Sequence, residues 1–105
     1  MSVNIEETTT GDHILIAVRG EVDLYSSPRL RTALLDAVPA AGIAVEVDLS
    51  GVEYIDSSGV ATLVEGLKSA RENNKEFILV EPSAPVRQVL ELARLDSIFE
   101  VKSAP

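Results

Sequence analysis

Residues 47–60 constrain the fold of this chain more than any other stretch, and they read Val-Asp-Leu-Ser-Gly-Val-Glu-Tyr-Ile-Asp-Ser-Ser-Gly-Val. An apolar strand enters a turn there, and two serine hydroxyls then stand at the start of an amphipathic helix. The first turn of a helix has backbone N–H groups without intrahelical partners, and the helix dipole adds partial positive charge. A phosphate on a serine at this position would find hydrogen-bond donors, so the stretch suits a reversible charge switch. The simpler interpretation is that Asp56, Ser57 and Ser58 only cap the helix.

Length and composition limit the classes of protein to consider. A chain of 105 residues suits one domain, which we expect to span positions 1–105. No run approaches the roughly 18 consecutive apolar residues of a membrane span. Residues 1–7 lack the basic and apolar regions of a signal peptide. The absence of cysteine excludes disulfides, thiolate metal sites and cysteine nucleophiles. We therefore expect a cytoplasmic protein.

The charge of the chain bears on its partners. The formal net charge is −8, which repels nucleic acid phosphates and anionic lipid surfaces, and the nine Lys and Arg are scattered along the sequence. Two explanations stay open. The acidity can favour a protein partner with a basic face, or it can serve solubility alone.

Strand and helix signals alternate along the chain. Ser27-Pro28 starts the first helix, with Ser27 as the N-cap and Pro28 at the first helical position, where no N–H is needed. Residues 19–23 lead into this helix as a loop. Two further helices begin near Ser58 and Ala84. The predicted strands cover residues 3–8, 13–18, 43–49, 77–80 and 98–101.

This order of elements predicts an α/β fold. We expect a single domain with a four- to five-stranded, mostly parallel sheet, an antiparallel edge at the N-terminus and three main helices. The antiparallel edge follows from the first two strands, which form a hairpin around the Gly11-Asp12 turn. The short links leave no room for a lid or an inserted segment.

The sequence lacks the usual signatures of catalysis. His13 is the only histidine, and no pattern ties it to a serine nucleophile. The Gly-x-Ser-x-Gly spacing, the phosphate-binding loop and the dinucleotide fingerprint are all missing. Asp23 and Asp56 lie at the ends of predicted strands, where parallel neighbours could bring them together. Two acidic residues without a substrate pocket are weak support for a Mg²⁺ site. We predict a non-enzyme with no cofactor and no metal.

Residues 20–28 and 48–60, with a weaker echo at 85–95, resemble the anti-sigma factor antagonists of bacteria, the single-domain members of the STAS family. The resemblance covers essentially the full chain, and the motifs are specific in this order and spacing. It implies that Ser57 is phosphorylated by a partner that is both serine kinase and anti-sigma factor. Many relatives have a second glycine where this chain has Ala61, which bears on the partner that fits. The implied phosphosite neighbours and partner-binding residues are Asp23, Asp56, Ser58, Gly59, Ala61 and Thr62.

The resemblance also implies a partner-switching cycle in transcription regulation. The unphosphorylated chain would bind the anti-sigma kinase and free the sigma factor. The phosphorylated chain would dissociate from the kinase until a PP2C-type phosphatase removes the phosphate. A negative charge at a helix N-terminus is locally favourable by about 0.3–1 kcal/mol, so the phosphate should act at the interface rather than by unfolding the domain.

This mechanism places demands on the surface of the second helix. Ser57 should be exposed, because a kinase must reach its hydroxyl. The small residues Gly59, Ala61 and Gly66 would let a partner approach the helix closely. For Gly66 the alternative is packing against the chain's own sheet, since an interior helical glycine costs on the order of 1 kcal/mol relative to alanine and needs a reason.

Two other functions stay open. The chain could be a STAS subunit fixed in a larger assembly, such as a lipid-transport ATPase complex or a stress-signalling scaffold, whose activity does not require phosphorylation of Ser57. It could also be a small-anion or nucleotide sensor that holds its ligand at the helix N-terminus.

Overall fold

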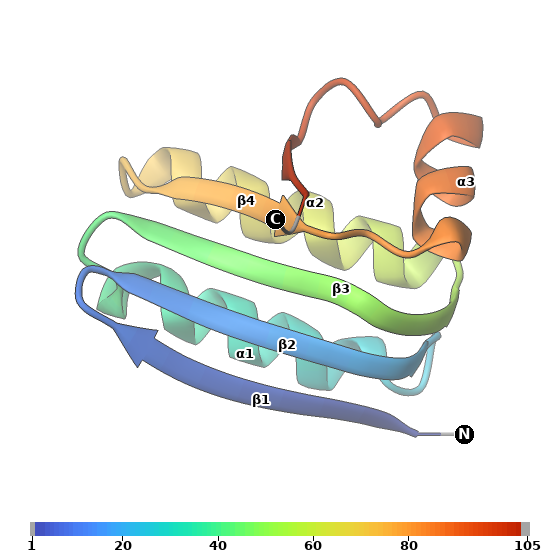
Figure 1. Ribbon diagram of the computed structural model, residues 1–105, viewed down its shortest axis with the longest axis horizontal. Helices are drawn as coiled ribbons and strands as arrows, with labels where there is room; N and C mark the ends of the chain where they lie inside the picture. The colour runs from blue at the N-terminus through green and yellow to red at the C-terminus, as the bar shows by residue number, and fades with distance from the viewer. Residues whose placement is uncertain (1, 104–105) are drawn as a thin grey trace.

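In residues 2–103, which the computed structural model describes, strands and helices alternate as the sequence pattern predicts (Figure 1). The strands form one sheet in the order β1-β2-β3-β4-β5, with β1 antiparallel to β2 and all later neighbours parallel. The predicted α/β fold, with its mixed sheet, antiparallel edge and three helices, is confirmed. The elements are β1 (Val3–Thr10), β2 (His13–Val22), α1 (Ser27–Ala40), β3 (Ala44–Ile55), α2 (Ser57–Glu72), β4 (Glu76–Val80), α3 (Ala84–Leu92) and β5 (Glu100–Lys102).

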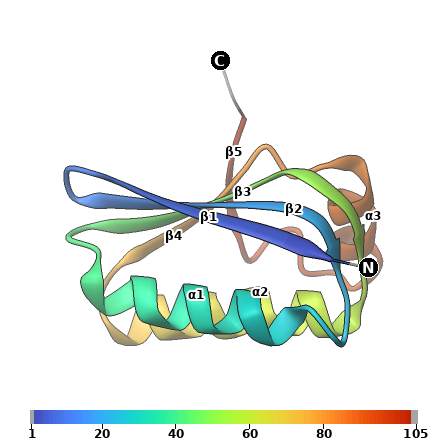
Figure 2. The same ribbon diagram turned by 90° about the horizontal axis from the view of Figure 1, so that it is seen from below.

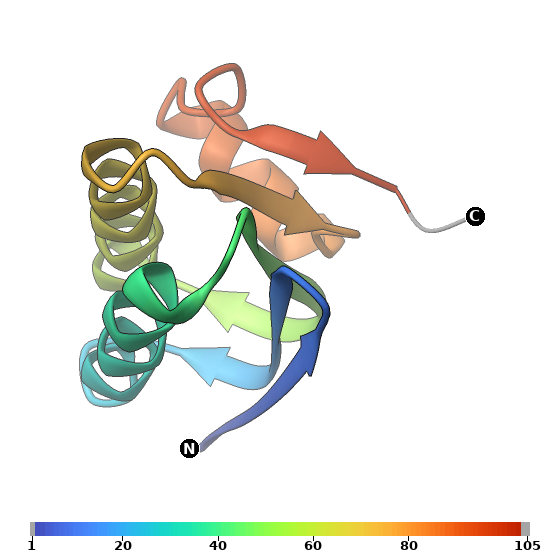
Figure 3. The same cartoon turned by 90° about the vertical axis from the view of Figure 1, so that its left-hand side faces the viewer.

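The helices α1 and α2 lie side by side on one face of the sheet (Figures 2 and 3). Both belong to right-handed β-α-β crossovers that step in the same direction along the sheet, so both fall on the same face. The third helix, α3, runs crosswise to them near the carboxyl ends of the central strands (Figure 1). Its N-cap residue Ser83 joins it to β3, because the Ser83 hydroxyl donates to the Val52 carbonyl at 2.6 Å.

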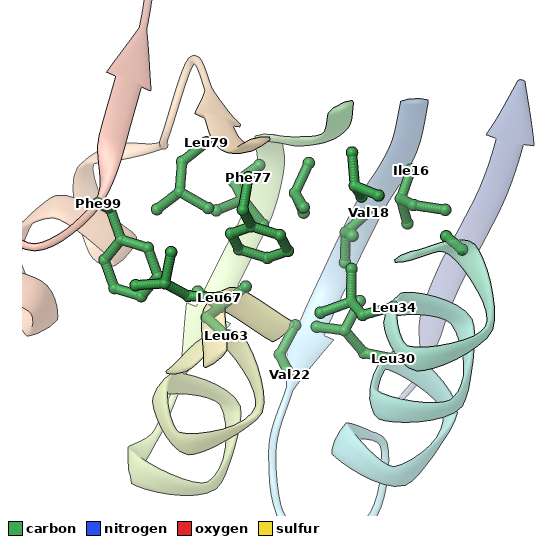
Figure 4. Close-up of a cluster of buried hydrophobic side chains, with 14 of the residues drawn as sticks. Ile16, Val18, Val22, Leu30, Leu34, Leu63, Leu67, Phe77, Leu79 and Phe99 are labelled. Atoms are coloured by element: carbon green, nitrogen blue, oxygen red, sulfur yellow. The ribbon is translucent and has the colours of Figure 1, made fainter. Parts of the chain in front are cut away.

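The hydrophobic core fills the space between the sheet and the α1–α2 pair (Figure 4). Side chains of a strand alternate between its two faces, so every second residue of β2 and β3 enters the core. Each fully buried aliphatic side chain is worth about 1.5–3 kcal/mol relative to an exposed one. The rings of Phe77 and Phe99, 6.4 Å apart, tie the segment before β5 to β4. Residues at most 1% exposed include Ile16, Val18, Leu30, Leu34, Leu63 and Leu79.

Both β2 and β3 are longer than predicted, and the extra length carries the functional site. The predicted loop over residues 19–23 is wrong, because β2 continues to Val22, and β3 continues past Leu49 to Ile55. The register between the two strands shifts twice, and each time β3 contributes one residue more than β2. Such bulges break the two-residue period that marks a strand in a sequence, so the pattern ends before the strands do.

Two glycines make this bulged pairing possible. Gly51 lies opposite Arg19, and a Cβ at that position would come within 2.7 Å of the Arg19 Cγ atom. Gly20 has a φ of +95°, a conformation that residues with a side chain rarely adopt. A Cβ there would also lie 2.5 Å from the Ser2 carbonyl oxygen. Position 20 therefore requires glycine, and a side chain at position 51 would displace that of Arg19.

The helix starts follow the sequence prediction to within one residue. The N-cap of α1 is Ser26 rather than Ser27, and Pro28 lies in the first turn. Helix α2 begins at Ser57, with Asp56 as its N-cap, and α3 begins at Ala84. Within residues 2–103, no helix has both the length and the apolar character needed to cross a membrane.

Candidate functional site

The site lies where the carboxyl ends of β2 and β3 meet. Val22 and Ile55 are register partners at these ends, and the N–H of Asp56 donates to the Val22 carbonyl at 3.1 Å. This bond brings the loop after β2 against the loop after β3. The two predicted acidic positions, Asp23 and Asp56, therefore leave neighbouring strands side by side, as parallel pairing requires.

Asp56 is the N-cap of α2. Its Oδ1 atom accepts hydrogen bonds from the backbone N–H groups of Ser58 at 2.9 Å and Gly59 at 3.3 Å. The same oxygen accepts the Ser58 hydroxyl at 2.6 Å. These bonds satisfy two of the four N–H groups that a helix leaves free at its start. The cap function that the sequence offered to Asp56, Ser57 and Ser58 together thus belongs to Asp56.

Ser57 differs from its neighbours at the head of α2. Its side chain is exposed, as expected, whereas Asp56 and Ser58 are half-buried. Among residues 2–103 the Ser57 hydroxyl has no hydrogen-bond partner. A hydroxyl that is exposed and unpaired can be reached by another protein without breaking an internal contact.

The loop that follows β2 is held together by its own hydrogen bonds. Asp23 Oδ1 accepts the backbone N–H groups of Tyr25 and Ser26, both at 2.9 Å. The Ser26 hydroxyl accepts the Asp23 N–H at 2.9 Å and donates to the Glu21 carbonyl at 2.7 Å. The pKa of the Asp23 carboxyl lies below its ordinary value of 3.8, mainly because the carboxylate accepts the Ser26 N–H. The Ser26 hydroxyl and the Tyr25 N–H lower this pKa further, while desolvation raises it. Asp23 therefore shapes this loop as an ionised carboxylate.

The structure divides the small residues of α2 between two faces. A Cβ on Gly59 would lie 2.6 Å from Ile55 Cγ1, and one on Gly66 would lie 2.8 Å from Phe77 Cζ. Both glycines are buried, so they are small because the helix packs closely on its own sheet. The expectation that Gly59 and Gly66 open the helix to a partner is corrected accordingly. Of the three small residues, Ala61 alone is exposed.

Thr62 is also directed toward the interior. It is only 4% exposed, and its hydroxyl donates to the Ser58 carbonyl at 2.9 Å. Among the predicted partner-binding residues, Ala61 thus offers open surface on α2, while Asp23, Asp56 and Ser58 are partly accessible.

Sequence reasoning missed three exposed hydrophobic side chains near the carboxyl ends of β2 and β3. Leu24 is 66% exposed and Tyr25 is 88% exposed, and both lie in the loop that Asp23 orders. Tyr54, which is 47% exposed, lies in β3 two residues before Asp56. The available signal was that Leu24 and Tyr25 fit neither the strand period before them nor the helix period after them. We call Leu24, Tyr25 and Tyr54 the apolar rim.

Anion binding at the head of α2 is less favourable than the sequence suggests. Asp56 occupies the Ser58 and Gly59 N–H groups and places a carboxylate beside any incoming anion. An open groove of about 480 Å³ exists between β1 and α1, but Ser57 is not among the residues that line it. Within the described chain, His, Cys, Asp and Glu side chains form no group of three that could hold a metal ion.

Comparisons with known proteins bear on the family and the fold of this chain. The family model described as "Mlab, STAS domain" matches residues 5–100. A protein named anti-sigma-B factor antagonist from Listeria monocytogenes is 36% identical over 98% of this chain and 90% of its own length. The crystal structure of an anti-sigma factor antagonist from Mycobacterium paratuberculosis superposes with a TM-score of 0.85 at 24% identity, over 95% of this chain and 85% of that one. The Bacillus cell fate determinant SpoIIAA in its phosphorylated form superposes with a TM-score of 0.77 at 20% identity, over 97% and 92%.

Proposed function

This chain belongs to the STAS domain family, and from that membership we propose that it acts as an anti-sigma factor antagonist. In the unphosphorylated state it binds an anti-sigma factor with serine kinase activity, and the sigma factor is released. Phosphorylation of Ser57 reverses this binding, and a PP2C-type phosphatase resets the cycle. The observation that carries the proposal is the Ser57 hydroxyl at the head of α2, which is exposed and has no hydrogen-bond partner in the described part of the chain. The chain is also 36% identical to a protein named anti-sigma-B factor antagonist.

The surroundings of Ser57 support a charge-driven release of the partner. A phosphate adds about −1.5 to −2 charge at neutral pH. Asp56 already occupies the Ser58 and Gly59 N–H groups, so its own helix offers the phosphate little compensation. Burying this group in an interface would carry an effective penalty of several kcal/mol. Phosphorylation should therefore weaken partner binding while the fold stays intact.

The apolar rim supports a protein as the partner. Exposed aromatic side chains are enriched at the centres of protein interfaces, where they contribute much of the binding energy. The hydrogen bonds of Asp23 and Ser26 hold the backbone of the loop that carries Leu24 and Tyr25, so little backbone entropy is lost when a partner covers this loop. The apolar rim and Ser57 both lie at the carboxyl ends of β2 and β3, which the Asp56 N–H to Val22 carbonyl bond joins, so an interface centred there would include the phosphate.

The position of His13 supports a role as phosphoacceptor rather than as an enzyme. His13 begins β2 and pairs with Ala44, the first residue of β3, whereas Ser57 follows the opposite end of β3. The His13 Nδ1 atom lies 3.2 Å from Glu46. The histidine is thus at the opposite end of the sheet from the serines, and its ring is paired with Glu46 on the neighbouring strand β3.

Binding of charge variants tests this function. The probe is the anti-sigma kinase recovered from native cells on immobilised Ser57→Ala protein and then purified. In calorimetric titrations Ser57→Ala should bind like the parent chain, and Ser57→Asp should bind at least about tenfold more weakly, a change of ~1.4 kcal/mol. Ser97→Asp is the matched control, because Ser97 is exposed and lies outside the site. Equal affinities for Ser57→Ala and Ser57→Asp would favour the non-switching subunit instead.

A further inference from the structure

Two serines stand side by side at the head of α2, and the structure distinguishes them. Ser57 is exposed and its hydroxyl is unpaired among the described residues. Ser58 is half-buried, and its hydroxyl donates to Asp56 Oδ1 at 2.6 Å. This distance lies in the range of charge-assisted O–H···O⁻ bonds, which are roughly twice as strong as neutral ones. Ser58 could keep this bond while reaching a kinase only if Asp56 moved with it.

Asp56 is fixed on both sides. Its carboxylate also accepts the Ser58 and Gly59 N–H groups, and its own N–H donates to Val22 on the neighbouring strand. The Ser58 main chain is held as well, because its carbonyl accepts the Thr62 hydroxyl at 2.9 Å. The Ser58 hydroxyl therefore can leave only by breaking its bond to Asp56.

Phosphoryl transfer makes different demands on the two hydroxyls. In the reaction the serine Oγ–P bond forms, the bond from the γ-phosphorus of ATP to the bridging oxygen breaks, ADP departs, and the hydroxyl proton passes to a base of the kinase. Ser57 can meet this geometry without losing an internal contact. Ser58 would first lose its bond to Asp56, and the new phosphate would then stand beside that carboxylate.

We propose that Asp56 restricts phosphorylation to Ser57 by holding the Ser58 hydroxyl. Asp56 is on this view a specificity-determining residue that acts through Ser58 and takes no part in the chemistry. The inference rests on the proposed function, because it concerns the choice of acceptor in that reaction.

The test compares Ser57→Ala with the double variant Ser57→Ala/Asp56→Asn. Asparagine caps helices about as well as aspartate but lacks the charge, so the fold is kept while the hold on Ser58 weakens. With ATP and the kinase that phosphorylates the parent chain, peptide mass spectrometry should find Ser57→Ala phosphorylated at less than one hundredth of the parent rate. In the double variant, phosphate on Ser58 should rise at least tenfold over Ser57→Ala.

The chain offers a matched control for the aspartate-to-asparagine change. The Ser50 N–H and hydroxyl both donate to Asp48 Oδ1, at 2.9 and 2.7 Å, in the same local arrangement on β3. Asp48→Asn in the Ser57→Ala background should leave Ser58 unphosphorylated. Phosphorylation of Ser58 in Ser57→Ala within tenfold of the parent rate would overturn the inference. So would a double variant no different from Ser57→Ala, because the kinase alone would then select the position.

A measurement without the kinase separates this inference from the proposed function. In NMR spectra the Ser58 hydroxyl proton should exchange slowly with water in Ser57→Ala and at least tenfold faster in the double variant. If the parent chain accepts no phosphate, the proposed function fails, and the hydroxyl exchange still decides whether Asp56 holds Ser58. A Ser58 hydroxyl that exchanges equally fast in both variants contradicts the inference in either case.

Discussion

Replacing Asp56 with alanine should destabilise the fold far more than replacing the adjacent Ser57. Asp56→Ala removes one oxygen that accepts two backbone N–H groups and one hydroxyl. Loss of an N-cap side chain costs about 1 kcal/mol, within a range of 0.5–2. A hydrogen bond to a charged group adds about 1.5–3 kcal/mol, reduced here because the half-buried Ser58 hydroxyl can turn to water. We expect a loss of about 2 kcal/mol in the free energy of unfolding.

Urea unfolding followed by circular dichroism at neutral pH measures this loss, and thermal unfolding should show a fall in Tm of about 8 °C or more. Ser57→Ala should stay within ~0.5 kcal/mol of the parent, as is usual for exposed positions. Asp56→Asn should lie between the two, because asparagine also caps helices. A Ser57→Ala loss as large as that of Asp56→Ala would refute the assignment of the cap to Asp56 alone.

Three further predictions concern the loop, the helix surface and the pH dependence. Tyr25→Ala should weaken binding to the anti-sigma kinase at least about tenfold in calorimetry with unchanged Tm, since the side chain is 88% exposed; an unchanged affinity would remove it from the interface. Gly66→Val should lower the free energy of unfolding by about 1–3 kcal/mol, because the valine side chain would clash with Phe77. Ala61→Val should stay within ~0.5 kcal/mol of the parent, because Ala61 is exposed. Equal losses for the two variants would contradict the division of α2 into a buried and an exposed face. The lowered pKa of Asp23 means that its contribution to stability is present above the unfolded value near 3.8 and is lost as pH falls through the folded value. The stability difference between parent and Asp23→Ala should therefore be constant above about pH 5 and shrink below pH 4 in acid unfolding, and a difference that grows toward low pH would reverse the assigned sign.

The predictions that succeeded depend on neighbours within one turn or one strand. The start of α2 was found because an acidic residue and two serines precede an amphipathic run, and the structure confirms that the helix begins at Ser57. The alternation of strands and helices likewise follows from periods of two and 3.6 residues, which side-chain direction imposes locally. The exposure of Ser57 was expected for a different reason, which is that a kinase must reach its hydroxyl, and the structure does place this residue at the surface.

The predictions that failed depend on particular partner residues that hydrophobic period and capping preference do not identify. Residues 19–22 of the predicted loop are strand, because β2 pairs with a bulged β3 more than thirty positions away. The N-cap of α1 shifted to Ser26 because the Asp23 carboxylate organises the preceding loop. Propensity rules describe a residue in isolation, and both of these outcomes depend on a particular partner.

The sequence by itself determined the order of elements, the mixed sheet and the position of the candidate phosphosite at the head of α2, because these depend on local hydrophobic period and capping chemistry. The tertiary structure alone decided that Gly66 faces Phe77 and that Tyr25 faces solvent. It also decided that Asp56 holds the Ser58 hydroxyl, whereas that of Ser57 has no hydrogen-bond partner within residues 2–103. The two adjacent serines cannot be told apart from the sequence. They differ once the pairing of β2 with β3 has fixed Asp56, which accepts the Ser58 hydroxyl and leaves Ser57 exposed to solvent.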